Sequence, residues 1–194
     1  MKTFKLTGVA RTETGKKATV ANRREGILPA VIYGGKENTN FSIKEDDVQK
    51  LVFSPDVFIV DLTIDGKSCK AMLKDIQFHP VKDTILHIDF MEVFETKPIV
   101  MAVPVVLKGL AEGVKAGGKL NLEKRKLRVK AVYADIPENL VIDVTSLGLG
   151  KSLQVGELSF DKLEIIEAKN AVVCGVRLTR AARGAAAAAA ASGK

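Results

Sequence analysis

The segment Ile85-Leu-His-Ile-Asp-Phe-Met91 alternates apolar and polar side chains with the two-residue period of a β-strand. One face of this strand would carry Leu86, Ile88 and Phe90 into a core. The other face would then hold His87 and Asp89 side by side on the outside. We predict a strand with an outward hydrogen-bonding pair on a rigid sheet, an arrangement suited to base edges or ribose hydroxyls.

Strand and helix signals surround this segment through residues 1–95. Further strands are expected at 4–11, 29–33, 58–64 and 67–76, and the last two are joined by the tight turn Asp65-Gly66. Helices are expected at 16–25, closed by Gly26, and after the capping box Ser42-Ile-Lys-Glu45, with Val48, Leu51 and Val52 on its apolar face. Six or so strands with two helices predict a closed or nearly closed antiparallel β-barrel.

The pattern changes at Glu95-Thr-Lys-Pro98. Beyond this point, Gly-rich turns separate strand-like segments at 99–107, 127–132, 140–144, 163–166 and 172–178. We therefore predict a mainly β protein with a barrel domain at 1–95 and a second mainly β domain at 96–179. Residues 180–194 contain the alanine run Ala185–Ala191 beside Arg180 and Arg183. This last segment is expected to be a flexible, basic, Ala-rich tail.

Charge is strongly segregated along the chain, whose net charge is +7. Residues 1–36 hold eight Lys and Arg against two Asp and Glu, whereas residues 37–95 hold six against twelve. Residues 96–194 hold sixteen against nine. The net values are therefore +6, −6 and +7, and the positive segments favour a polyanionic partner.

The first expected helix carries part of this positive charge. Lys16, Thr19 and Arg23 are spaced at i, i+3 and i+7, so they share one face, and Arg11 ends the preceding strand. These side chains could line up along successive phosphates, with arginine as a bidentate fork and lysine as a point charge. A merely solvated basic face is the alternative.

Other classes of protein have little support in the sequence. Cys69 and Cys174 match no metal or redox spacing, which is typical of reduced thiols in a cytoplasmic protein. The longest apolar stretch, Ile99 to Leu107, is too short to span a bilayer and is broken by Pro104, so no membrane association is expected. We expect no cofactor, no metal and no enzymatic activity. A hydrolase or metal enzyme that uses His79, His87 and Asp89 is an alternative, and metal analysis of the purified protein would test it.

Two ordered motifs carry a resemblance to a known family. The first is Arg11-Thr-Glu-Thr-Gly15-Lys16 followed by Arg23-Arg-Glu-Gly26-Ile-Leu-Pro29-Ala30-Val31-Ile-Tyr33-Gly34. The second is Asp75-Ile-Gln77-Phe-His79-Pro80 followed by His87-Ile88-Asp89-Phe90. Together they resemble the ribosomal protein L twenty-five family over most of residues 5–95. The additional β domain is similar to the long form of that family, also called the general stress protein CTC type.

The resemblance implies a six-stranded β-barrel of the large ribosomal subunit that binds 5S ribosomal RNA at loop E, on the minor-groove side. Carried over by motif, it implies RNA contacts by Arg11, Lys16, Arg23, Tyr33, Gln77, His87 and Asp89; Thr19 joins them through its helix face, and His79 lies inside the motif. The sequence departs from the family where a pair of arginines usually follows the Gly-Lys, because Val20 and Ala21 stand there. Lys17 and Arg24 are neighbouring candidates to replace them.

Two questions stay open at this level. The second domain is expected to contact neighbouring ribosomal RNA or a ribosomal protein. The alternative function is a condition-dependent stress accessory factor of the ribosome that uses the same RNA face. Stoichiometry on ribosomes purified during growth would discriminate between a constitutive and a conditional component.

Overall fold

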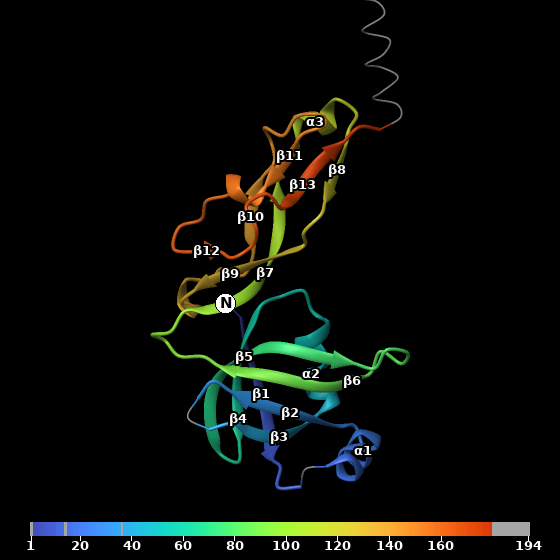
Figure 1. Cartoon of the computed structure of the whole chain (residues 1–194), viewed down its shortest axis with the longest axis vertical. Helices are drawn as coiled ribbons and strands as arrows, with labels where there is room; N and C mark the ends of the chain where they lie inside the picture. Colours follow the sequence, from blue (N-terminus) through green and yellow to red (C-terminus); the bar gives the residue numbers. More distant parts are fainter. Residues whose placement is uncertain (1, 14, 36, 180–194) are drawn as a thin grey trace, which may run out of the picture. The chain divides into compact units, whose positions relative to one another are not determined.

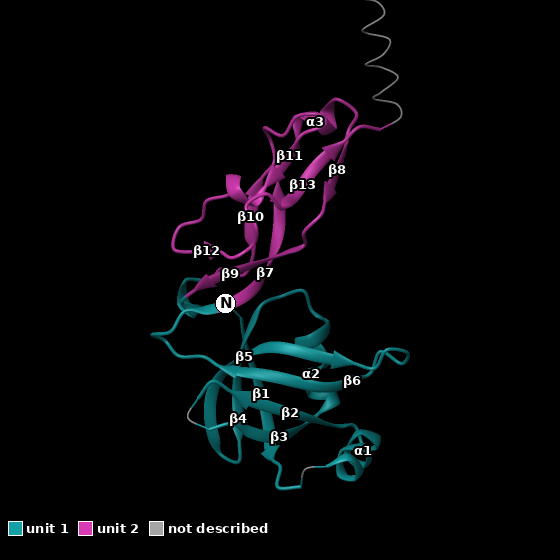
Figure 2. Cartoon of the chain, viewed as in Figure 1, with its two compact units in different colours: residues 1–99, 132–136 teal, residues 100–131, 137–194 magenta. Residues whose placement is uncertain are grey.

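The computed structural model describes residues 2–13, 15–35 and 37–179, which fall into two units (Figures 1 and 2). The first unit comprises residues 1–99 and 132–136, and the second comprises 100–131 and 137–194. The tail predicted for 180–194 lies outside the described residues.

Six strands of the first unit close into a barrel in the order β1-β3-β2-β6-β5-β4. Their bounds are β1 Lys2–Ala10, β2 Ile27–Tyr33, β3 Thr39–Lys44, β4 Phe58–Ile64, β5 Lys67–Phe78 and β6 Ile85–Glu92. Helix α1 (Lys16–Arg24) connects β1 to β2, and α2 (Glu45–Phe53) connects β3 to β4. The predicted six-stranded barrel with two helices is confirmed.

The barrel is not antiparallel throughout, however. Strands β1 and β4 pair in parallel, as do β2 and β6, whereas the remaining neighbours are antiparallel. Tight hairpins produce antiparallel neighbours, but these two pairs are joined by long connections that bring the chain back in the same direction. The prediction of a fully antiparallel barrel was wrong for this reason.

The predicted capping box at Ser42 is also wrong. Ser42 lies within β3, paired with both Pro29 and Val9, and α2 begins only at Glu45, without a side-chain cap. Phe41 and Ile43 on either side of Ser42 are buried, so the two-residue period of a strand prevails over the local capping pattern. Sheet pairing satisfies the backbone groups of this segment.

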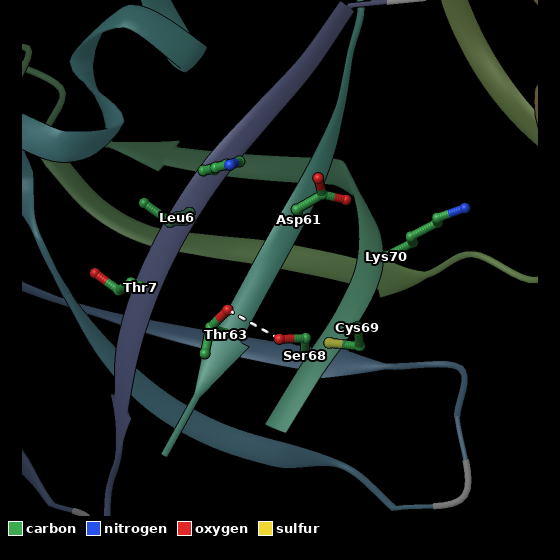
Figure 3. Close-up of a pocket in the computed structure, with 8 residues that line it drawn as sticks. Leu6, Thr7, Asp61, Thr63, Ser68, Cys69 and Lys70 are labelled. Atoms are coloured by element: carbon green, nitrogen blue, oxygen red, sulfur yellow. Dashed lines mark hydrogen bonds between the residues drawn. The ribbon is translucent and has the colours of Figure 1, made fainter. Parts of the chain in front are cut away.

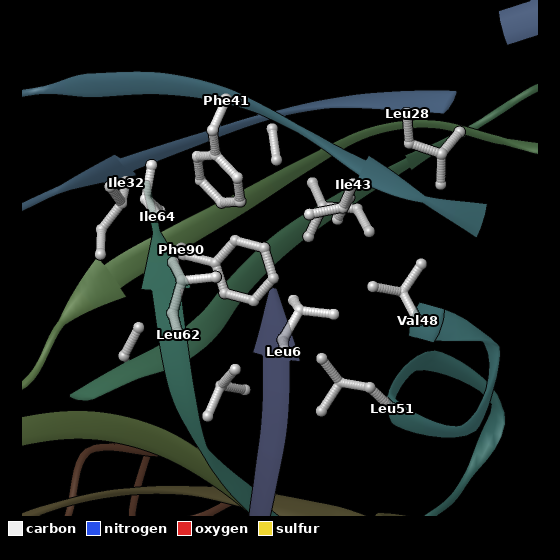
Figure 4. Packing of buried hydrophobic residues seen from close by; sticks show 14 of the residues in the cluster. Leu6, Leu28, Ile32, Phe41, Ile43, Val48, Leu51, Leu62, Ile64 and Phe90 are labelled. Carbon is white, nitrogen blue, oxygen red and sulfur yellow. The ribbon is translucent and has the colours of Figure 1, made fainter. Parts of the chain in front are cut away.

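Buried apolar side chains from all six strands fill the barrel, and α2 contributes Val48 and Leu51 (Figure 4). The rings of Phe41 and Phe90 meet inside it at 5.8 Å between centroids. Gly8 of β1 makes room for this packing, because a Cβ built there would lie 2.6 Å from Cδ2 of Phe41. At the β4–β5 hairpin, Asp65 and Gly66 both take positive φ, 46° and 83°, as the predicted tight turn requires.

A β-bulge interrupts the pairing of β5 with β6. Phe78 pairs with Ile85 and Gln77 with His87, so Leu86 is the extra residue of β6. Ile85, which is 2% exposed, takes the core position predicted for Leu86, and Leu86 is only half-buried. Ile88 and Phe90 are fully buried, as expected.

The second unit is mainly β, which confirms that part of the fold prediction. One sheet has the order β10-β7-β9-β12, and the other has the order β11-β13-β8. The elements are β7 Ile99–Lys108, α3 Glu112–Lys115, β8 Lys119–Leu122, β9 Lys126–Ala131, β10 Leu140–Asp143, β11 Ser152–Gln154, η2 Val155–Glu157, β12 Glu164–Ile165 and β13 Val172–Arg177. The short strands β8 and β11 were not predicted.

A short 3-10 turn, η1 (Tyr133–Asp135), follows β9 but belongs to the first unit. The hydroxyl of Tyr133 donates to Glu95 at 3.1 Å and accepts from Lys70 Nζ at 3.2 Å. Lys70 also pairs with Glu95 at 3.3 Å. Residues far apart in the chain thus complete the barrel unit.

Candidate nucleic-acid interface

The predicted pair His87 and Asp89 lies on the outer wall of the barrel, on β6. The imidazole Nδ1 and carboxylate Oδ1 are 2.7 Å apart, and each side chain is 28% exposed. Because an ionised carboxylate can only accept, we assign the proton of this hydrogen bond to Nδ1 of His87. This bond leaves Nε2 of His87 and the second oxygen of Asp89 available to a partner.

Strands β2 and β5 flank β6 and extend this polar wall. Gln77 lies directly opposite His87, and Asp75 lies directly opposite Asp89. On the other side, burial raises the pKa of Tyr33 above its ordinary value, and the negative charges of Asp89 and Asp75 raise it further. Tyr33 therefore keeps its hydroxyl proton and is a donor at neutral pH. We call Tyr33, Asp75, Gln77, His87 and Asp89 the polar wall.

Asp75 was not among the predicted site residues. It lies inside the second sequence motif and shares a strand face with Gln77, so alternation alone could have found it. Its carboxylate is exposed beside that of Asp89. The wall is therefore acidic at this point, and its carboxylates would repel phosphates but accept hydrogen bonds from base amino groups.

Arg23 joins α1 to the wall. Its Nε and Nη2 donate to the backbone carbonyl of Leu86 at 3.1 and 2.7 Å. Leu86 is the bulged residue, immediately before His87. The guanidinium, predicted to contact phosphate, thus uses two of its five N–H groups to hold the end of α1 beside the polar wall.

The beginning of α1 has its own hydrogen-bond network. Thr19 Oγ1 donates to the Gly15 carbonyl at 2.7 Å and accepts from Arg11 Nη2 at 3.3 Å. Arg11 also donates to the Glu13 carbonyl at 3.2 Å. Gly15 has φ 151°, a conformation that favours glycine and lets the chain enter the helix. Arg11 and Thr19 are brought together, and their mutual contacts orient Arg11.

Lys17 and Arg24 of α1 lie on a different face from Arg23. Lys17, Val20, Ala21 and Arg24 are all exposed and spaced at i, i+3, i+4 and i+7. Lys16 is exposed at the start of the helix. The positions of Val20 and Ala21 therefore lie between Lys17 and Arg24 on one solvent-facing side, which we call the basic face.

His79 has a different task from His87. Its Nδ1 accepts hydrogen bonds from the backbone N–H groups of Val81 and Lys82, each at 3.2 Å. The backbone N–H of His79 donates to the backbone carbonyl of Thr84 at 2.8 Å. His79 thus organises the loop between β5 and β6.

A hollow of about 520 Å³ lies along β1, β4 and β5 (Figure 3), and its lining includes none of the predicted site residues. Thr63 and Ser68, at 3.2 Å, share a hydrogen bond in its lining. Cys69 also lines it, and burial raises the pKa of this thiol above its ordinary value, with a smaller effect from Glu92. A raised pKa keeps the sulfur protonated and poorly nucleophilic at neutral pH.

Among residues 2–13, 15–35 and 37–179, no helix is long and apolar enough to cross a membrane. Within the same ranges, no group of three or more His, Cys, Asp or Glu side chains is arranged to hold a metal ion.

Comparison with known proteins covers both units. Residues 6–90 match the model of the ribosomal L25p family, and residues 98–180 match the C-terminal domain of ribosomal protein TL5. A Porphyromonas gingivalis protein named large ribosomal subunit protein bL25 is 63% identical over 188 residues, which cover 96% of this chain and 98% of the relative. Proteins of the same name from Phocaeicola vulgatus and Bacteroides fragilis are 58% and 57% identical over 194 residues, covering 96–97% of this chain and 98–99% of theirs. At this identity over nearly the whole length, the chain belongs to the ribosomal L25p family.

Proposed function

We propose that this chain binds 5S ribosomal RNA, in its loop E region and from the minor-groove side, as a component of the large ribosomal subunit. Family membership supports the coarser conclusion, a structural and non-enzymatic ribosomal protein of the cytoplasm. The contact with 5S RNA is our inference from the polar wall and the basic face.

The polar wall has the chemistry for reading base edges. Asp75 and Asp89 accept hydrogen bonds, the Tyr33 hydroxyl donates, and the Gln77 amide does both. A-form RNA hides its major groove and displays base edges and 2′-hydroxyls in a wide, shallow minor groove, which a flat sheet face can approach. The carboxylates would accept from exocyclic amino groups, which only base edges offer.

The basic face would supply the electrostatic part of binding. Lys16, Lys17 and Arg24 are exposed, and Arg11 lies at the entry to the helix. If about four phosphates are neutralised, the binding constant should fall with salt at a log–log slope of roughly −3 to −4. Binding that does not respond to salt would contradict this part of the proposal.

The proposal depends most on the contact between Arg23 and Leu86, which holds the basic helix next to the His87–Asp89 pair. Phosphate-binding cations and base-reading groups are therefore fixed in one arrangement on a rigid barrel. Such preorganisation lowers the entropic cost of binding a structured RNA.

The experiment is a titration of a loop E fragment of 5S RNA with the full chain and with Asp89→Asn. Loss of one base contact should weaken binding by about 1–3 kcal/mol, or roughly 5- to 150-fold. Asp61→Asn is the matched control, because this half-buried carboxylate lies on β4, outside the polar wall. Unchanged or tighter binding by Asp89→Asn would reject the wall as the RNA contact.

For the second unit, we propose a contact with a neighbouring ribosomal RNA segment or ribosomal protein. Its strand β9 exposes Lys126, Arg128 and Lys130 on one face. Arg128 pairs with Glu167 at 3.3 Å and Lys130 with Glu164 at 3.2 Å, so this row is partly neutralised. Chemical cross-linking from Lys126 in intact subunits would identify the neighbour.

A further inference from the structure

Two phenylalanine rings contact each other on the surface of the barrel unit. Phe53, the last residue of α2, is 66% exposed, and Phe78, the last residue of β5, is 42% exposed. Their centroids are 6.4 Å apart, with planes inclined by 50°. Val81, three residues beyond Phe78, is 84% exposed. Scattered exposed apolar residues are ordinary, but a contacting aromatic pair is a concentrated apolar surface.

The fold does not account for this exposure. Neither ring belongs to the barrel core, which Phe41 and Phe90 occupy (Figure 4). Helix α2 is anchored through the buried Val48 and Leu51. Full burial of a phenylalanine stabilises a protein by about 1.5–3 kcal/mol, and the Phe53 ring gains only part of this in the free chain.

Charge indicates what would cover the pair. Exposed residues Asp46, Gln49, Lys50 and Phe53 are spaced at i, i+3, i+4 and i+7, so the aromatic ring shares a face of α2 with an acidic first turn. That turn carries Glu45, Asp46 and Asp47. Helix α2 therefore carries three carboxylates against a single cation, Lys50. A polyanion would be repelled here, whereas a basic protein surface would be attracted.

We infer that Phe53, Phe78 and the exposed face of α2, together called the aromatic surface, dock a basic protein of the same ribosomal subunit. The pair would fill an apolar pocket on that partner, and Asp46 and Asp47 would face its lysines and arginines. Buried aromatic anchors within a charged rim are typical of protein–protein interfaces. The inference rests on ribosomal membership and stands apart from the 5S RNA contact.

Site-specific photo-cross-linking tests the occupant directly. The full chain, carrying benzoylphenylalanine in place of Phe53, is bound to large subunits that lack the native protein. We expect cross-links to a Lys- and Arg-rich segment of one ribosomal protein, several-fold above those from position 9. Val9 is a matched control, since it is also 66% exposed but lies on β1. Cross-links to ribosomal RNA, or a yield equal to that of the control, would overturn the inference.

A second measurement uses Phe53→Ser combined with Phe78→Ser. Loss of an anchor of this kind should make the full chain dissociate from the subunit on the order of tenfold faster. Its affinity for the isolated loop E fragment should be unchanged. An equal loss on the isolated RNA would overturn the inference, with circular dichroism used to verify folding. A failure of Asp89→Asn to weaken RNA binding would instead count against the 5S proposal alone.

Discussion

The contact between Arg23 and the Leu86 carbonyl gives a test that separates positioning from phosphate binding. Arg23→Lys keeps the charge but loses the two-pronged bond to the carbonyl. We expect loop E affinity to fall severalfold while the log–log salt slope stays the same, because no phosphate contact is lost. Titrations at several salt concentrations give both quantities. A slope smaller in magnitude by about 0.7–0.9 would indicate that Arg23 itself neutralises a phosphate.

Val20 offers the complementary gain of function. It lies on the exposed basic face between Lys17 and Arg24. Val20→Arg should therefore tighten loop E binding severalfold and steepen the salt slope by about 0.7–0.9. Val9→Arg adds the same charge on β1 and serves as the control. An equal gain from both variants would mean that net charge, rather than the place of the charge, determines the affinity.

Tyr33 reports on the charge of the polar wall. Burial is the largest cause of its raised pKa, followed by Asp89 and then Asp75. In a Tyr133→Phe background, Tyr33 is the single tyrosine of the chain. Its ultraviolet titration should have a midpoint above the ordinary 10.0, and Asp89→Asn should lower that midpoint without restoring 10.0. Since the folded pKa is raised, this group's contribution to stability is present below about pH 10 and is lost as pH rises through the folded pKa.

At the scale of elements, alternation in the sequence was enough to predict five of the six barrel strands and the outward position of His87 and Asp89. Strand β3 was not predicted, because Ser42 and Glu45 match the pattern of a helix start. Only the pairing with β1 and β2 favours the strand. The bulge at Leu86 was not predicted either, since it arises from the register between two strands. The partner of Arg23, a backbone carbonyl at that bulge, was therefore beyond sequence reasoning.

The packing of β1 against β3 can be tested at Gly8. Gly8→Ala would place a methyl group only 2.6 Å from Cδ2 of Phe41, so the ring must move. Overpacking of this kind should cost about 1–3 kcal/mol of unfolding free energy. Urea unfolding of the barrel unit measures it, with Thr7→Ala, exposed on the same strand, as control. A loss below about 0.5 kcal/mol would show that Phe41 has room to shift.

At the scale of the whole molecule, two surfaces of one barrel unit have opposite electrostatic character. The basic face of α1 suits phosphates, whereas the acidic face of α2 with its exposed aromatic pair suits a basic protein. Under the two proposals, the positive charge of α1 would face RNA, whereas the carboxylates of α2, which are part of the −6 segment, would face a protein. Each surface would then bind a different neighbour of complementary charge.

The chain also returns to the barrel unit through Tyr133, and this link should depend on pH. The hydrogen bond from Lys70 is the largest cause that lowers the pKa of Glu95, and the Tyr133 hydrogen bond is the next. The pKa of Lys70 is raised, first by Tyr133 and then by Glu95. Stabilisation from the lowered Glu95 pKa is lost as pH falls through that pKa. Stabilisation from the raised Lys70 pKa is lost as pH rises through that pKa.

Tyr133→Phe should move the Glu95 pKa upward yet leave it below the ordinary 4.5, because Lys70 remains. Carboxyl ¹³C NMR titration measures this shift, and an unchanged Glu95 pKa would mean that Tyr133 does not bond to the carboxylate in solution.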